Sequence, residues 1–231
     1  MKRQYFGDIR DLFKFDVIEN LIKNLKLASF LYVIMLTKDG GKGGKKRDFE
    51  EAIRNKRHGT KNTKLLNLIE RVSSQKSEHH DISGEITKYY KETTPHCIIK
   101  CIDNMLEKDT PGDYFCRVYS DYFDQVEREM KGLDNPYLIF LDPDTGLEPQ
   151  SSKGKKYVSF ETVARLYSRL NQNSLMMIYQ HGVGERTHKR EILNKISPYH
   201  SYISDGEIDF FFLMKKGEIK EKIDAVLNSY K

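Results

Sequence analysis

The sequence predicts a single α/β domain, in which a mostly parallel β-sheet is covered by helices on both faces. Two observations predict this class. Apolar runs of strand length alternate along the chain with amphipathic segments, which is the order of strand–helix–strand units. Several of these runs are apolar at nearly every position, as strands buried on both faces are. Within the 231 residues we expect one domain over 1–231, with a helical or loop insertion at about 45–110.

Composition indicates an intracellular protein with a well-solvated surface. Charged residues make up 32% of the chain, and no stretch approaches the roughly 18 apolar residues of a membrane span. No apolar run of signal-peptide type follows the N-terminal residues 1–5. The odd cysteine count, from Cys97, Cys101 and Cys116, fits reduced thiols better than disulfides. We therefore expect a soluble, cytoplasmic protein with no membrane partner.

The first predicted element is an amphipathic helix over 11–25, with apolar residues at steps of three and four. Asp8, Asp11 and Lys14 are three residues apart and would share one face of that helix. In one interpretation Asp8 caps the helix and Asp11 pairs with Lys14. In the other, Lys14 and Tyr5 lie against a ligand near the first strand.

A buried strand is predicted over 30–36, because the run is rich in aromatic and β-branched residues. It ends in a glycine-rich loop over 38–44. Glycines let backbone amides approach a phosphate or a carboxylate, although this loop lacks the Gly-Lys-Ser/Thr of a P-loop. A flexible basic loop is an equally good interpretation. A polar helical stretch follows through about Val72.

The middle of the chain is less clear. Residues 73–94 have the least structured composition and are expected to form a linker or the tip of an insertion. Residues 97–106 are apolar and could form a helix or a strand. We predict a strand over 114–119 and a helix over 120–130.

Strands and helices alternate again in the C-terminal third. The predicted strands are 137–141, 174–179 and 208–214. The predicted helices are 159–170, 186–196 and 219–230. Ser159 is a plausible N-cap for the first of these helices.

The strongest candidate site is the strand end Asp142-Pro143-Asp144-Thr145-Gly146. Functional groups gather at the carboxyl ends of parallel strands, and Pro143 ends the strand and orients its neighbours. Two carboxylates this close indicate binding of a cation, a hydroxyl or an amine, whereas an Asx-type turn is the structural alternative. Gln180 and His181 end the next strand, and such a histidine can act as a base or a metal ligand.

A metal-dependent site is one interpretation of the two carboxylates. Asp142 and Asp144, with Glu148 or His181, would hold Mg²⁺ in a nuclease or phosphoesterase.

Basic residues are concentrated between 38 and 64, whereas the formal net charge of the chain is only +5. Such a stripe can neutralise phosphates, or it can be a solvated surface that keeps the protein soluble. We expect a nucleic-acid partner. The candidate phosphate contacts are Lys42, Lys45, Lys46, Arg47, Arg54 and Arg57.

This order of elements resembles the Rossmann-like class I S-adenosylmethionine-dependent methyltransferases. The segment 142–145 is similar in place to the Asp/Asn-Pro-Pro-Tyr/Phe motif of amino-methyltransferases, and residues 5–7 followed by Lys14 resemble the start of adenine-N6 methyltransferases. The strand end 140–143 is also similar to that of the three-Cys-motif partner proteins.

The resemblance implies S-adenosylmethionine as cofactor and a set of site residues. Cofactor contacts would come from Asp39, Gly40 and Gly41, and target-amine contacts from Asp142 and Pro143, with Asp142 accepting hydrogen bonds from the amine. From their places in the sequence, Lys14 is a further candidate for cofactor binding, and Asp144 and His181 are further candidates for catalysis.

The chain departs from the family pattern in two ways. Asp144 and Thr145 replace the second proline and the aromatic residue, which normally stacks on an extruded base. No clear acidic residue ends a second strand to hold the cofactor's ribose. The first hypothesis is a nucleic-acid-directed methyltransferase-like enzyme acting on an amine. The alternatives are the Mg²⁺-dependent enzyme and a non-catalytic nucleic-acid or partner-binding module on a degenerate methyltransferase scaffold.

Overall fold

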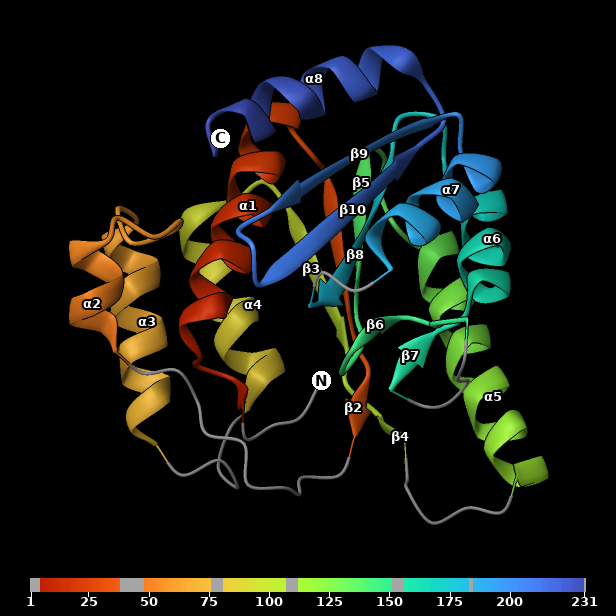
Figure 1. Cartoon of the computed structure of the whole chain (residues 1–231), viewed down its shortest axis with the longest axis horizontal. Helices are drawn as coiled ribbons and strands as arrows, with labels where there is room; N and C mark the ends of the chain where they lie inside the picture. Colours follow the sequence, from red (N-terminus) through yellow and green to blue (C-terminus); the bar gives the residue numbers. More distant parts are fainter. Residues whose placement is uncertain are drawn as a thin grey trace.

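A six-stranded sheet forms the centre of the computed structural model, which describes residues 5–37, 48–75, 81–106, 112–150, 156–182 and 185–230 (Figure 1). The strand order is β3-β1-β5-β8-β10-β9. The strand bounds are β1 (Ser29–Ile34), β3 (Ile98–Ile102), β5 (Tyr137–Asp142), β8 (Leu175–His181), β9 (Tyr199–Ser204) and β10 (Ile208–Met214).

Four neighbouring strands run parallel, and one strand reverses. β1 pairs in parallel with both β3 and β5, and β5 pairs in parallel with β8. β10 lies antiparallel between β8 and β9. The predicted mostly parallel α/β sheet is therefore confirmed.

Two short ladders continue the chain beyond the carboxyl ends of the main strands. β2 (Leu36–Thr37) pairs with β4 (Met105–Leu106), and β6 (Gly146–Leu147) pairs with β7 (Tyr157–Val158). The predicted strand 30–36 is thus interrupted at Met35. The ladders fix the directions in which the chain leaves β1, β3 and β5.

Helices cover both faces of the sheet, which gives three layers (Figure 1). One face carries α1 (Ile9–Leu25), α4 (Ile82–Thr93) and α8 (Gly217–Asn228). The other face carries α5 (Gly112–Lys131), α6 (Phe160–Arg169) and α7 (Arg186–Ile196). The helices α2 (Phe49–Arg54) and α3 (Thr63–Ser74) lie outside α1. The segment 45–110, for which an insertion is predicted, contains α2, α3, α4, β3 and β4.

The apolar core is divided by the sheet into two clusters. In β1, Phe30 and Tyr32 belong to the cluster beneath α1, whereas Leu31 and Val33 belong to the cluster beneath α5. This alternation is the period of two expected for a strand buried on both faces. The continuous apolar runs of the sequence are explained by this double burial.

The strand predicted over 114–119 is wrong, because α5 continues without a break from Gly112 to Lys131. Its described apolar residues recur at helical steps, with Tyr122, Val126 and Met130 each four apart and all buried. The short aromatic-rich run has high strand propensity, but the helical period of Tyr122, Val126 and Met130 extends the helix over the whole segment.

The expectation of little structure over 73–94 is also wrong. Residues 82–93 form α4, and the Asp81 carboxylate caps it by accepting a hydrogen bond from the Gly84 amide. Ile82, Ile86 and Tyr90 are buried at four-residue steps against the sheet. The open question over 97–106 is answered by strands β3 and β4.

The C-terminal third agrees closely with its prediction. The helices predicted over 159–170 and 186–196 form, with Ser159 as N-cap of α6. The sequence did not predict β9, which begins directly after Pro198 and alternates between exposed and buried residues. Among the described residues, no helix has the length and apolar character needed to span a membrane.

Candidate functional site

The predicted site lies where the strand order of the sheet reverses. The chain leaves β1 toward β3 on one side, and the later strands β5 and β8 fill the other side. Ile34 at the end of β1 is in register with Asp142 at the end of β5. In open α/β sheets, ligands bind in the crevice outside the carboxyl ends at such a reversal.

Asp142 lies in a buried polar cluster at this end of the sheet and is only 1% exposed. Its Oδ2 accepts hydrogen bonds from the Lys14 ammonium at 3.0 Å and from the Tyr32 hydroxyl at 2.6 Å. Tyr32 comes from β1 and Lys14 from α1, so three elements meet at one carboxylate. Burial and the Asp142 charge both raise the pKa of Tyr32, so this hydroxyl stays protonated and donates.

Lys14 is oriented by its own helix. The Asp8 carboxylate caps α1, and Asp11 lies 2.9 Å from the Lys14 ammonium, as one of the two interpretations predicted. Burial alone would lower the pKa of Lys14, but the Asp11 and Asp142 carboxylates outweigh it and the pKa is raised. The ammonium also lies 5.1 Å from the centre of the Tyr179 ring. Lys14 therefore remains a cation that joins two buried carboxylates.

The loop after Asp142 is fixed by Gln180 from β8. The Gln180 side-chain oxygen accepts a hydrogen bond from the Leu147 amide, and its nitrogen donates to the Thr145 carbonyl. A Cβ at Gly146 would lie 2.4 Å from that oxygen, and Gly146 has a φ of +134°. Glycine is needed at 146 for both reasons. Gln180 thus acts on the shape of the loop.

Asp144 lies on this loop, and His181 is the last residue of β8. Asp144 is partly exposed and His181 is exposed. The His181 amide donates to the Thr145 carbonyl at 2.8 Å, which places the two segments side by side. β5 and β8 are parallel neighbours, so Asp142 and the pair Gln180–His181 end adjacent strands.

Asp103 is a site residue that the sequence interpretation missed. It directly follows β3, the strand beside β1, and it is partly buried. Its Oδ2 accepts a hydrogen bond from the Ser83 hydroxyl at 2.6 Å. Burial and, secondarily, the Asp103 charge raise the pKa of Tyr122, whose hydroxyl donates to the Ile34 carbonyl. Asp103 therefore lies near the end of β1.

This finding corrects the expectation that no acidic residue ends a second strand. The sequence of residues 97–106 is compatible with a helix or with a strand, so it does not predict that Asp103 ends a strand. The signal was the apolar run 98–102 followed by a polar Asp-Asn pair.

Thr37 and Glu148 complete the surroundings. The Thr37 hydroxyl at the end of β2 is buried and has no hydrogen-bond partner among the described residues. Glu148 accepts a hydrogen bond from the Phe160 amide at 2.8 Å, at the start of α6. Glu148 thus stabilises a helix N-terminus.

The metal-binding interpretation receives no support from this arrangement. Lys14 occupies the Asp142 carboxylate, and a cation at that oxygen would have to displace it. Within the described part of the chain, no three His, Cys, Asp or Glu side chains come together as metal ligands.

Several predicted contacts fall outside the described residues. These are the proposed cofactor contacts Asp39, Gly40 and Gly41, and the basic residues Lys42, Lys45, Lys46 and Arg47. Arg54 is exposed at the end of α2. Arg57 lies 2.7 Å from Glu207, which also binds Arg10 of α1 at 3.3 Å.

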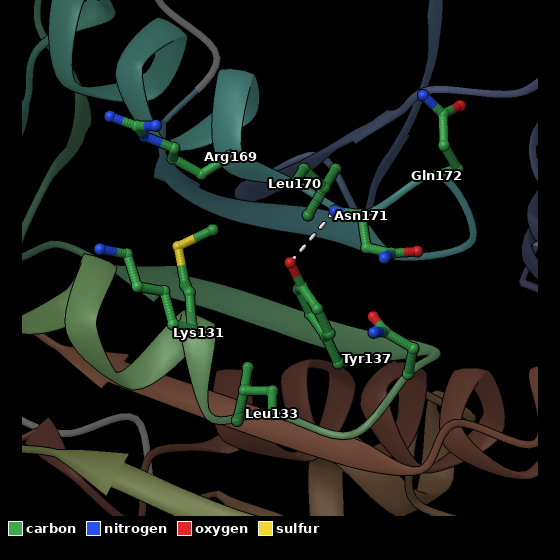
Figure 2. A pocket seen from close by; sticks show the side chains of 9 residues that line it. Lys131, Leu133, Tyr137, Arg169, Leu170, Asn171 and Gln172 are labelled. Carbon is green, nitrogen blue, oxygen red and sulfur yellow. Dashed lines mark hydrogen bonds between the residues drawn. The ribbon is translucent and has the colours of Figure 1, made fainter.

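A cavity of about 370 Å³ lies near the amino ends of the strands β5 and β8, at the end of the sheet opposite to Asp142 (Figure 2). It is lined by the first residue of β5, Tyr137, and by Lys131 and Arg169 at the ends of α5 and α6. The Tyr137 hydroxyl accepts a hydrogen bond from the Asn171 amide. This cavity is separate from the strand-end site.

The sheet order, the helices on both faces and the reversed strand β10 define a Rossmann-like three-layer α/β fold. No protein-family model and no curated protein matches the sequence. Among solved structures, human methyltransferase-like protein 13 in complex with SAH is similar, with a TM-score of 0.41 and 10% identity. The alignment covers 93% of this chain and 90% of that one.

Proposed function

We propose that this protein is an S-adenosylmethionine-dependent methyltransferase-like enzyme that modifies an amine of a nucleic acid. The observation that carries the proposal is Asp103, a partly buried carboxylate at the end of the second strand of the sheet. In Rossmann-like folds an acidic residue at this place binds the hydroxyls of a ribose. S-adenosylmethionine contains such a ribose and supplies a methyl group on a sulfonium.

The neighbouring side chains fit a ligand of this kind. The Thr37 hydroxyl, buried and without a hydrogen-bond partner among the described residues, lies at the end of β2, directly before the glycine-rich loop 38–44. A buried hydroxyl without a partner is costly, so a ligand that bonds it would gain free energy. The buried cluster at Asp142 holds α1, β1 and β5 together at the strand ends.

Basic residues near the crevice support a nucleic-acid substrate. Arg57 and Arg10 share Glu207, and Arg10 is near enough to His181 to lower its pKa. The exposed side chains of Arg54, Lys56 and Lys61 flank Arg57 in the sequence. Phosphate contacts from this side would direct a strand across the strand-end site.

Calorimetry with S-adenosylmethionine tests the cofactor part of the proposal. We expect the wild-type protein to bind it, and Asp103→Asn to weaken binding about tenfold or more, because a charged hydrogen bond contributes about 1.5–3 kcal/mol. Asp121→Asn, at an exposed position of α5, is the matched control and should bind as wild type. Absence of binding to the wild-type protein would overturn the proposal.

The nucleic-acid part is tested by fluorescence anisotropy with unmodified DNA and transcribed RNA at several salt concentrations. Replacing Lys42, Lys45 and Lys46 with alanine should lower the affinity and reduce the slope of log K against log[salt] by about 2–3, since each lysine that neutralises a phosphate adds close to one to that slope. The control replaces the exposed lysines Lys131, Lys195 and Lys222. Equal effects of the two triple variants would indicate non-specific attraction only.

A second candidate is a non-catalytic binding module on the same scaffold. The hydrogen bonds that Asp142 accepts from Lys14 and Tyr32 favour this candidate. They engage the carboxylate that, in the family motif, would accept a hydrogen bond from the target amine. Cofactor binding without methyl transfer to any nucleic acid tested would support this candidate.

A further inference from the structure

The strand-end loop carries a second carboxylate, and its surroundings differ from those of Asp142. We propose that Asp144 and His181 form the substrate-facing pair, in which Asp144 accepts a hydrogen bond from the target amine and His181 takes the proton released on methylation. This inference rests on the proposed function and reassigns the role that the motif gives to Asp142.

Asp142 is placed for support. Its carboxylate is 1% exposed and binds a cation and a phenol from two other elements. A target amine at Oδ2 would compete with the two donors already bound there. Displacing Lys14 would leave its ammonium with Asp11 alone of the two carboxylates that it now contacts. Separating a buried ion pair is strongly unfavourable, and a neutral amine cannot replace the cation.

Asp144 has the properties that Asp142 lacks. It lies two residues further along the same loop and is partly exposed. No described residue donates a hydrogen bond to it or forms an ion pair with it. The loop that carries it is held by Gln180 through the Thr145 carbonyl and the Leu147 amide. An accessible carboxylate on a fixed loop is pre-organised to accept an N–H group.

His181 is placed beside Asp144 and is oriented by Tyr179. The Tyr179 hydroxyl lies 3.4 Å from Nδ1 of His181, so Nε2 is the ring nitrogen that we assign to accept the proton. Partial burial and the Arg10 charge lower the pKa of His181, whereas Asp144, Asp8 and Glu207 act in the opposite direction. The net shift is downward, so the imidazole is neutral near pH 7 and can accept a proton.

The reaction balances with these two groups. The amine nitrogen forms a bond to the methyl carbon as the carbon–sulfur bond of the sulfonium breaks, and the sulfur keeps the electron pair. The methylated nitrogen then carries one proton too many, and Nε2 of His181 takes it. The Asp144 carboxylate stabilises the positive charge that develops on the nitrogen before the proton leaves.

An NMR titration of the histidines in the ligand-free protein tests the geometry without any turnover. We expect Asp144→Asn to lower the pKa of His181 further, because a charge that raises it is removed. Asp121→Asn, the exposed control on α5, should leave it unchanged. An unchanged His181 pKa in Asp144→Asn would overturn the pair.

Methyl transfer from labelled S-adenosylmethionine to amplified DNA and transcribed RNA tests the roles. Asp144→Asn should lower kcat/KM about tenfold or more. His181→Asn should lower kcat about hundredfold and remove the acidic limb of the pH profile. His96→Asn, at an exposed position before β3, is the matched control and should change neither quantity.

Cofactor binding separates the two levels of the proposal. Asp144→Asn and His181→Asn should both bind S-adenosylmethionine within about twofold of wild type, because neither residue lies on the Asp103 side of the crevice. If the wild-type protein does not bind the cofactor, the proposed function fails. If it binds and transfers methyl groups while Asp144→Asn is fully active, only the pair fails.

Discussion

Lys14 donates a hydrogen bond to Asp142 across 128 residues of sequence, with 3.0 Å between Nζ and Oδ2. The two side chains are 5% and 1% exposed, so the pair is almost entirely removed from water. It joins the first helix to the end of β5, where the strand order reverses. The pair is thus the structural link between the N-terminal helix and the candidate site.

Breaking this pair from one side should destabilise the protein strongly. Lys14→Met leaves two buried carboxylates without their cation, and we expect the free energy of unfolding to fall by about 3–5 kcal/mol. Urea denaturation measures this change in the free energy of unfolding. Lys23→Met removes a partly exposed lysine that pairs with Glu19 on the same helix, and should cost less than about 1 kcal/mol.

The double variant Lys14→Met with Asp142→Asn tests whether the two residues interact directly. Because the neutral amide no longer needs the cation, the double variant should lose less stability than the sum of the single variants. If the loss of stability in the double variant equals the sum of the two single losses, Lys14 and Asp142 do not interact directly.

The folded protein should lose stability as the pH falls, because His58 is partly buried in its neutral form. Its ring packs 4.7 Å from the centre of the Phe13 ring, and burial lowers its pKa below the ordinary value of 6.5. The unfolded chain therefore takes up a proton at a higher pH than the folded chain does. Between the two pKa values the unfolded state binds more protons, so stability is present above about pH 6.5 and is lost as the pH falls.

Thermal unfolding at about pH 7.5 and about pH 5.5 measures this loss. His58→Phe keeps an aromatic ring between Phe13 and Tyr230 and should reduce the difference between the two pH values. A residual loss is expected, since burial also lowers the pKa of His181 and His200. If His58→Phe loses as much stability between the two pH values as the wild type, groups other than His58 cause the loss.

Gly146→Ala should distort the strand-end loop. The added Cβ would meet the Gln180 side-chain oxygen at 2.4 Å, and φ at 146 is +134°. Strain of both kinds should lower stability by about 2–4 kcal/mol. Gly206→Ala is the matched control, since its φ is +90° but nothing lies within 4 Å of the new Cβ. It should cost about 1 kcal/mol. Equal losses would mean that Gln180 moves aside freely.

Arg186 and Asp209 form a second ion pair that should be sensitive to geometry. The guanidinium binds both oxygens of Asp209, which is fully buried, at 2.8 Å and 2.7 Å. Arg186→Lys keeps the charge but cannot bind both oxygens at once, and should cost about 1–3 kcal/mol. Arg71→Lys alters a similar but more exposed contact with Glu85 and should cost less than about 1 kcal/mol. A smaller loss for Arg186→Lys than for Arg71→Lys would contradict this reasoning.

The sequence predicts those elements whose apolar pattern and capping residues lie within the element itself. The strands at 137–141 and 208–214 are continuous apolar runs, and the helix after Ser159 has both a cap and a helical period. The Asp8 cap and the Asp11–Lys14 pair are likewise local, because their partners lie within one or two helical turns.

Elements decided by tertiary packing could not be predicted. β3 is an edge strand with mostly half-exposed residues, so its run carries no clear period, and Asp103 was missed with it. The sequence marks Lys14 and Asp142 as candidates for ligand contacts, but nothing local in it pairs residues on two different elements. The burial of Asp142, and hence the different exposure of Asp144, depends on that pairing.

The reversed strand β10 has a consequence for the order in which the sheet can be assembled. β10 separates β8 from β9, although it is synthesised after both of them. Until residue 214 has left the ribosome, β8 has one bare edge and β9 has no partner in the sheet. β8 is apolar and buried over most of its length. Late in translation the nascent chain therefore exposes an unpaired apolar strand edge that is prone to aggregation. Premature termination before 208 would leave that edge open permanently and favour aggregation.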